Sequence, residues 1–94
     1  MKAELLLHER HQLALDRFAE IKVWRVPKSV AGSSHLFKYS LALVVDGICV
    51  LRYDNEAGKG DHRHAGDIEE SYDFVSPRQL MTDFWTDVDG WRQE

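Results

Sequence analysis

The chain has 94 residues, a formal net charge of −4 and 44% hydrophobic residues, which together indicate a single domain with one modest core. One cysteine excludes an intramolecular disulfide framework and a multi-cysteine zinc site. No apolar run approaches the roughly 18 residues that span a membrane, and no signal-peptide core follows the first residues, so a cytoplasmic location is expected. The net acidic charge argues against non-specific coating of nucleic acid.

The first predicted element, residues 3–15, is ambiguous. Apolar and polar residues alternate as in a strand, although apolar side chains also recur there at helical spacing. We favour the strand, with Asp16-Arg17 as the turn into a second strand at residues 18–26. Pro27 ends that second strand, because proline lacks the N–H that a sheet ladder needs.

Residues 37–45 predict a third strand, rich in aromatic and branched side chains. Near-continuous apolarity in residues 41–45 predicts a central strand that is covered on both faces. Asp46-Gly47 is the strongest hairpin signal in the chain, and residues 48–53 are the expected return strand. Cys49 lies in this apolar run and is interpreted as a small buried residue.

A polar, glycine-rich composition predicts a loop over residues 54–70, and a short strand is expected at residues 71–75. Ser76 and Pro77 then begin a C-terminal helix as N-cap and first residue. One apolar stripe on this helix should face the sheet, formed by Leu80, Phe84, Val88 and Trp91.

On the same helix, Asp83 and Asp87 are expected to face solvent. The predicted fold class is therefore α+β, in one domain over residues 1–94. Its architecture is an antiparallel β-meander of about five strands with one C-terminal helix packed on the sheet.

The densest group of ionisable side chains follows the fourth predicted strand. Six of them are candidate catalytic residues: Asp54, Lys59, Asp61, His62, Arg63 and His64. His62 and His64 lie two residues apart, so in an extended chain both imidazoles point to one side and Arg63 points to the other. Imidazoles exchange protons near neutral pH, which suits metal-free phosphodiester chemistry on RNA.

In that chemistry Lys59 and Arg63 would stabilise the charge that develops on phosphate, and Asp54 or Asp61 would orient a histidine. A metal site is an alternative, with His62, His64 and Asp61 as ligands and either His35 or His8 completing the set. A third interpretation is a non-catalytic clamp for phosphate or for a partner. The fourth is an ordinary solvated hairpin loop.

Further cations lie on or beside the predicted strands. If Lys22 and its neighbours share one sheet face, they form a groove for a phosphate backbone, with Trp24 and either Tyr39 or Tyr53 for base stacking. The candidate substrate-binding residues are Arg25, Lys38, Arg52, Tyr53 and Asn55. Neither a phosphate-binding loop nor a dinucleotide fingerprint is present, so no cofactor is expected.

The run Gly58-Lys59-Gly60-Asp61-His62-Arg63-His64 resembles a motif of the TumE-like toxin family. The resemblance extends to Tyr53-Asp54-Asn55 before this run and to Tyr72-Asp73-Phe74-Val75 after it. Upstream segments and the C-terminal helix share it too, namely Ala3–Leu6, Lys22–Pro27, Lys38-Tyr39 and Leu80–Phe84. The family has an Asp-Gly turn between its first two strands, where this sequence has Asp16-Arg17.

This resemblance implies the toxin of a type II toxin–antitoxin module, neutralised by a helix-turn-helix antitoxin. Action on RNA or translation is expected by extension from other toxins of this size, and a metal-independent ribonuclease is the sharpest form of that expectation. The alternative is a non-catalytic module that binds a partner or nucleic acid and occludes a target. An unpaired edge strand leaves a homodimer open as well.

Overall fold

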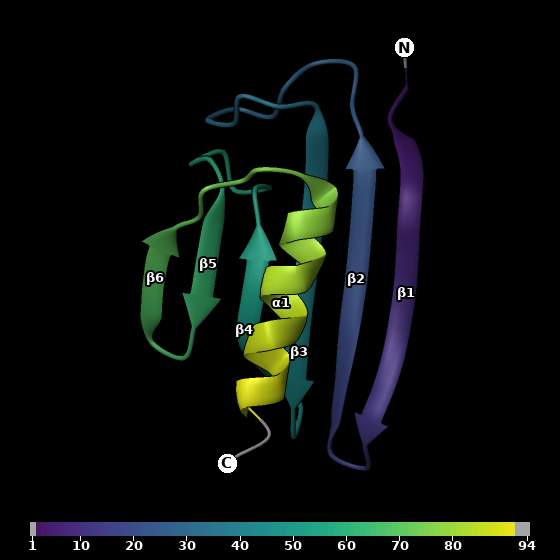
Figure 1. Ribbon diagram of the computed structural model, residues 1–94, viewed down its shortest axis with the longest axis vertical. Helices are drawn as coiled ribbons and strands as arrows, with labels where there is room; N and C mark the ends of the chain where they lie inside the picture. Colours follow the sequence, from purple (N-terminus) through teal and green to yellow (C-terminus); the bar gives the residue numbers. More distant parts are fainter. Residues whose placement is uncertain (1, 92–94) are drawn as a thin grey trace.

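A computed structural model describes residues 2–91 as one antiparallel sheet with a helix on one face (Figure 1). The sheet has six strands in chain order, β1-β2-β3-β4-β5-β6. The strands are β1 (Glu4–Ala14), β2 (Arg17–Arg25), β3 (Phe37–Val45), β4 (Ile48–Asp54), β5 (His62–Ala65) and β6 (Ile68–Ser71), and the helix is α1 (Pro77–Trp91). The predicted α+β meander with one C-terminal helix is confirmed, with six strands in place of about five.

The core lies between α1 and the central strands, because alternate strand residues point toward the helix. The buried sheet residues are Ala19, Ile21, Val23, Tyr39, Leu41, Leu43, Leu51 and Tyr53. From the helix, Leu80, Phe84 and Val88 are buried and Trp91 packs against their cluster, as the predicted stripe requires. Ser76 Oγ accepts the Gln79 backbone N–H at 3.1 Å, which is the predicted N-cap.

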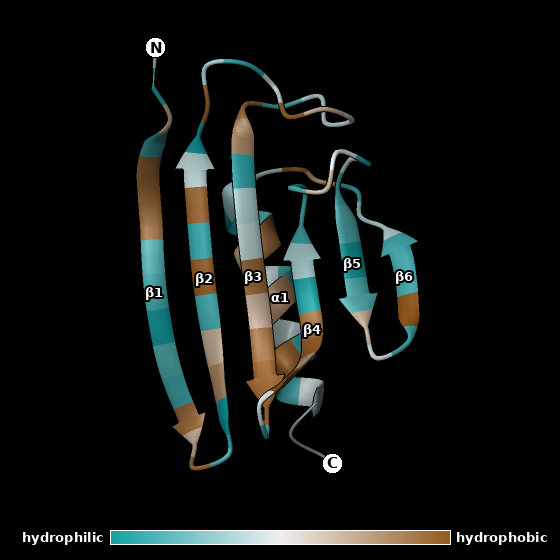
Figure 2. Ribbon diagram, turned by 180° about the vertical axis from the view of Figure 1, so that it is seen from behind, coloured by the Kyte–Doolittle hydropathy of each residue, from teal (hydrophilic) through white to brown (hydrophobic). Residues whose placement is uncertain are grey.

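No helix or strand of residues 2–91 covers the opposite side of the sheet, hereafter the open face (Figure 2). The expectation that β3 is covered on both sides is therefore wrong. Leu41 and Leu43 are buried under α1, whereas Ala42 and Val44 on the open face are only half-buried. Cys49 is exposed rather than buried, because it pairs with Val44 and shares that uncovered face.

The predicted loop at residues 54–70 contains two strands that sequence analysis missed. β5 and β6 form a hairpin in which Ala65 pairs with Ile68 across a turn of Gly66 and Asp67. Gly66 has φ +61°, the left-handed conformation that glycine adopts readily in such a turn. The expected strand at residues 71–75 is wrong, since Ser71 ends β6 and the chain then leaves the sheet and leads to α1.

The strand interpretation of residues 3–15 is confirmed, because Glu4–Ala14 pairs with β2 along its length. The Asp46-Gly47 hairpin is confirmed too, with φ of 51° and 78° at its two residues. Within residues 2–91, α1 does not combine the length and apolar character that crossing a bilayer would require.

Candidate functional site

The cross-strand register of β5 decides which face each residue of the His-Arg-His run occupies. His62 lies opposite Asp54 and His64 lies opposite Arg52, whereas Arg63 lies opposite Tyr53. Paired residues share a face, and Tyr53 is in the core under α1. Both imidazoles therefore lie on the open face, and the Arg63 side chain lies on the helix side.

A carboxylate that the sequence did not single out lies among the cations of this region. Glu69 Oε2 is 3.6 Å from His64 Nε2, 3.7 Å from Lys59 Nζ and 4.0 Å from His62 Nε2. The register explains this, since β6 places Glu69 directly opposite His64. Recognising Gly66-Asp67 as a two-residue turn would have revealed that pairing.

The two histidines differ in hydrogen bonding and in exposure to solvent. His62 Nδ1–H donates to the Gly60 carbonyl at 3.1 Å, which leaves Nε2 directed toward Glu69. The His62 side chain is 18% exposed, whereas the His64 side chain is 40% exposed and accessible from the open face. The pair therefore consists of one anchored ring and one accessible ring.

A track of polar and charged side chains extends from these histidines across the open face. One hollow of about 260 Å³ lies between Arg52 and His64. A second, of about 230 Å³, is lined by Trp24 and by charges of both signs, and small residues also line it. Its charged residues are Lys22, Arg52, Glu20 and Glu56, and its small residues are Ser40 and Ala42. Arg52 lines both hollows, so they adjoin each other on the open face between β5 and β2.

The remaining charges on this path are largely paired. Lys38 Nζ is 5.3 Å from the ring centre of Trp24 and 4.0 Å from Glu56 Oε2. Arg52 Nη1 is 3.7 Å from the Asp54 carboxylate, which is nearly buried. Asp54 therefore orients Arg52, and no hydrogen bond joins it to a histidine among the described residues.

Several sequence-predicted residues lie away from this path, beginning with Arg25, Tyr39 and Tyr53. Arg25 is opposite Glu4 and Phe37 in the sheet and shares the helix side, not the open face. Tyr39 and Tyr53 are buried in the core, so neither can stack on a base. The aromatic ring on the open face at the hollow is that of Trp24.

Asp61 is a structural anchor. Its carboxylate accepts hydrogen bonds from Ser33 Oγ at 2.7 Å, His35 Nε2 at 2.7 Å and Tyr39 Oη at 2.6 Å. Burial acts to raise the pKa of Asp61, but these three donors outweigh it and lower the pKa below its usual value. His35 Nδ1 accepts the Phe37 N–H at 3.1 Å, so both of its ring nitrogens are engaged and it has no free site for proton transfer.

Asn55 has a similar role and does not face the open side. It is fully buried, and its Oδ1 accepts the Tyr39 N–H at 3.0 Å while its Nδ2 donates to the Phe37 carbonyl at 2.8 Å. These bonds satisfy backbone groups at the start of β3. Asn55 and Asp61 thus join the loop before β3 to the loop before β5.

Arg63 connects the hairpin to the helix. Its Nε donates to Asp87 Oδ2 at 2.7 Å, and the Tyr53 hydroxyl donates to the same oxygen at 2.5 Å. The hydrogen bond to Asp87 raises the pKa of Arg63 above its ordinary range, and burial raises the pKa of Tyr53. The expectation that Asp83 and Asp87 face solvent is wrong, because Asp83 also accepts a hydrogen bond, from the Tyr72 hydroxyl.

The alternative metal site is not assembled. Among residues 2–91, no three histidine, cysteine or acidic side chains gather in a geometry that would hold a metal ion. The Asp61 carboxylate is bonded to Ser33, His35 and Tyr39 instead of facing the His62–His64 pair.

The fold and site thus define a small one-sided sheet protein whose open face carries a track of charged and polar side chains ending at two histidines. A family model described as Toxin TumE matches residues 2–92. Because this match covers nearly the whole chain, the protein belongs to the TumE toxin family. Membership of a toxin family implies an antitoxin partner. Neither a curated protein nor a solved structure matches the chain.

Proposed function

We propose that the chain is the toxin of a type II toxin–antitoxin module and that it cleaves RNA bound on the open face of its sheet. The observation that supports this proposal is the pair of adjoining hollows on the open face, one at Trp24 and one at His64, with Arg52 lining both. Single-stranded nucleic acid is typically held by cations along its backbone and by aromatic rings against its bases. Lys22, Lys38 and Arg52 supply the cations, and Trp24 supplies the ring.

The two histidines supply the chemistry at the end of this path. Residues two apart on a strand are separated by roughly 7 Å, a distance that one phosphodiester can bridge. We assign the base to His62, because its Nδ1–H is held by Gly60 and its Nε2 is the nitrogen left for a proton. The more exposed His64 is assigned as the acid.

In the proposed reaction, His62 takes the proton of a ribose 2′-hydroxyl while O2′ forms a bond to phosphorus. The bond between phosphorus and O5′ breaks, and His64 donates a proton to O5′. The products are a 2′,3′-cyclic phosphate and a 5′-hydroxyl end. Lys59 and Arg52 stabilise the charge on the phosphorane oxygens, and Glu69 holds Lys59 and both imidazoles near one point.

The test is cleavage of a single-stranded RNA by the purified protein, with and without EDTA. His62→Ala and His64→Ala should each reduce the rate at least 100-fold, within the range expected for loss of an acid or base. His8→Ala is the matched control, because His8 is an exposed open-face histidine on β1, far from β5 in the strand order. The products should carry cyclic phosphate, and circular dichroism confirms that each variant is folded.

Unchanged cleavage in both histidine variants would overturn this assignment of the acid and base. If EDTA abolished cleavage by the unmodified protein, His62 and His64 would be reassigned as metal ligands. Activity that survives EDTA and needs both imidazoles would support the metal-free mechanism.

A non-catalytic toxin that occludes its target is the second candidate. It is favoured by the pairing of Lys59 and both histidines with Glu69, which reduces the net charge at the site. Occlusion needs the charge of Lys38 and Arg52 but no imidazole. Under this alternative, Arg52→Glu abolishes toxicity whereas replacing both histidines by glutamine does not.

A further inference from the structure

The two edges of the sheet differ sharply. β6 has four residues and carries Glu69 and Glu70, the short, charged design that discourages pairing with another strand. β1 has 11 residues, and nearly all of them are exposed. Its apolar side chains include Leu5 and Leu6, which are 52% and 46% exposed. A long edge with exposed leucines is a template for strand addition.

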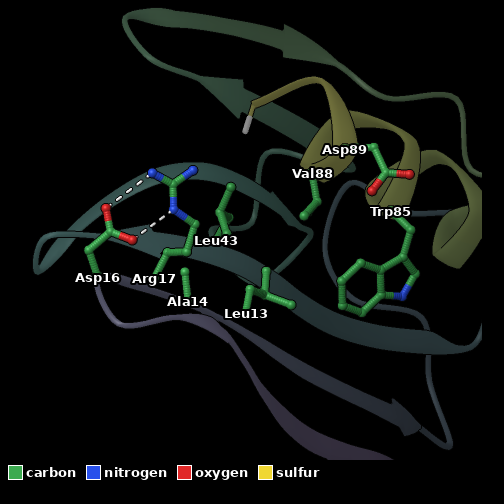
Figure 3. A pocket seen from close by; sticks show the side chains of 8 residues that line it. All are labelled: Leu13, Ala14, Asp16, Arg17, Leu43, Trp85, Val88 and Asp89. Atoms are coloured by element: carbon green, nitrogen blue, oxygen red, sulfur yellow. Dashed lines mark hydrogen bonds and ion pairs between the residues drawn. The ribbon is translucent and has the colours of Figure 1, made fainter. Parts of the chain in front are cut away.

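An apolar groove runs beside this edge on the helix side. It has a volume of about 400 Å³ and lies between the end of β1 and the C-terminal half of α1 (Figure 3). Leu13, Leu43, Val88 and Trp85 form its apolar lining. Leu13 is 41% exposed, so α1 does not extend far enough sideways to cover it. A strand added to β1 would place alternate side chains on this groove.

The charges of β1 disfavour two of the three central registers in which a second copy of the chain could be that strand. A two-fold axis normal to the sheet at Glu9, the middle of β1, would place Glu9 opposite its own copy. Moving the axis to the next residue would place Arg10 opposite its own copy. Like charges directly opposite each other destabilise an antiparallel pair, so these two registers are unfavourable, whereas an axis at His8 would place only His8 opposite its own copy.

The other side of β1 has a basic character that a different chain could match. His8 and Arg10 share the open face, and Lys22 lies opposite His8 on β2. The acidic residue among them, Glu20, is already 3.7 Å from His8 Nε2. Arg10 lies over the Phe18 ring, with its guanidinium carbon 3.8 Å from the ring centre, and so is held at the edge. An incoming strand meets His8 and Arg10 on this side, together with Leu5. On the helix side it meets Leu7 and the groove at Leu13, together with Glu9 and His11.

We propose that β1 is the docking edge for the antitoxin, which adds an extended segment as a seventh strand. That segment alternates apolar side chains, which enter the groove at Leu13 and Trp85, with acidic side chains, which pair with His8 and Arg10. The sheet then continues past β1, and the exposed leucines are covered. The proposal rests on the antitoxin partner that family membership implies, and not on the cleavage of RNA.

The test uses the complex of the full chain with the antitoxin encoded beside it, purified after co-expression. Hydrogen exchange should show that residues 4–14 become protected in the complex, while residues 68–71 of the opposite edge do not. The proposal would be overturned if the exchange rates of residues 4–14 were the same in the free chain and in the complex, or if no complex formed.

Variants test the two sides of the strand separately. Leu13→Asp and Arg10→Glu should each raise the dissociation constant of the complex at least tenfold. The matched controls are Ile68→Asp, on the exposed apolar residue of β6, and Arg78→Glu, on the exposed first turn of α1, and both should change it less than twofold. If a variant misfolds, hydrogen exchange in the complex of the unmodified proteins still tests the proposal, because that measurement needs no substitution.

The remaining alternative is a homodimer of the toxin through β1, and a mass measurement of the free toxin in solution tests it. A dimer that Leu13→Asp converts to a monomer would assign β1 to a second copy and overturn the proposal. RNA cleavage by Leu13→Asp, measured separately, should equal that of the unmodified protein, so a failure of docking is distinguishable from a failure of the proposed ribonuclease function.

Discussion

A β-carbon built on Gly32 would lie 2.4 Å from the backbone nitrogen of Gly60, so the two glycines hold their loops in direct backbone contact. Gly60 also has φ +89°, a conformation that other residues rarely adopt. The second glycine of the Gly-Lys-Gly run is thus explained by loop packing. The contact sets the start of β5, and with it the position of His62.

Replacing Gly60 by alanine should lower the free energy of unfolding more than the same change at Gly58. Both have positive φ, which costs a side chain about 1–2 kcal/mol. At Gly60 the new β-carbon would also lie 2.8 Å from the Gly32 carbonyl oxygen, whereas at Gly58 nothing lies within 4 Å. The clash should add about 1–3 kcal/mol. Urea unfolding of both variants measures the difference. An equal loss in the free energy of unfolding at Gly58 and Gly60 would contradict the contact between Gly60 and Gly32.

Asp61→Asn should destabilise the protein by about 1–3 kcal/mol at pH 7, because an amide cannot accept all three donors of the carboxylate. The pKa of Asp61 is lowered from its ordinary value of 3.8 in the folded state. A depressed carboxyl pKa contributes stability above the unfolded value, and this is lost as pH falls through the folded value. The difference in the free energy of unfolding between the unmodified protein and Asp61→Asn should therefore narrow below about pH 4. A gap that stays constant to pH 2 would refute this linkage.

Arg63 and Asp87 should be energetically coupled, whereas Arg63 and Glu70 should not. The Arg63–Asp87 contact is 2.7 Å long with both side chains 24% exposed, and Glu70 is 54% exposed. A double-mutant cycle to alanine should give a coupling of about 1–2 kcal/mol for the first pair. For the exposed pair we expect less than about 0.5 kcal/mol. The reverse order would show that the hairpin is not held to α1 through Arg63.

Binding of single-stranded RNA should depend on salt through the open-face cations. Each phosphate contact contributes about 0.7 to the slope of log K against log salt for a single strand. Lys38→Ala should therefore reduce the slope by about 0.7, whereas Arg78→Ala should leave it unchanged because Arg78 lies on the helix side. Binding titrations from about 50 to 200 mM salt measure the slope for each variant. Equal slopes for Lys38→Ala and the unmodified protein would contradict the phosphate contact.

The sequence predicts β2 to β4 and α1 because apolar residues and the residues that end or begin each element mark them, whereas the apolar residues of β1 fit both strand and helical spacing. β5 and β6 have four residues each, mostly charged or polar, and so give no apolar period. The role of Asp61 could not be predicted, since its donors Ser33, His35 and Tyr39 lie 22 to 28 residues away in the chain. The side occupied by Arg63 followed from spacing, but its partner on the helix did not.

The strand order also has a consequence for how the chain acquires its structure. Each strand pairs only with its neighbours in sequence, so every ladder closes a short stretch of backbone. Such local connectivity lowers the entropic cost of reaching the folding transition state and favours fast folding for a β-rich chain. Strands can add one after another as synthesis proceeds. The helix follows all six, so Ile21 and Leu41 stay uncovered until α1 emerges, and that interval is when a nascent toxin is most exposed to chaperones and proteases.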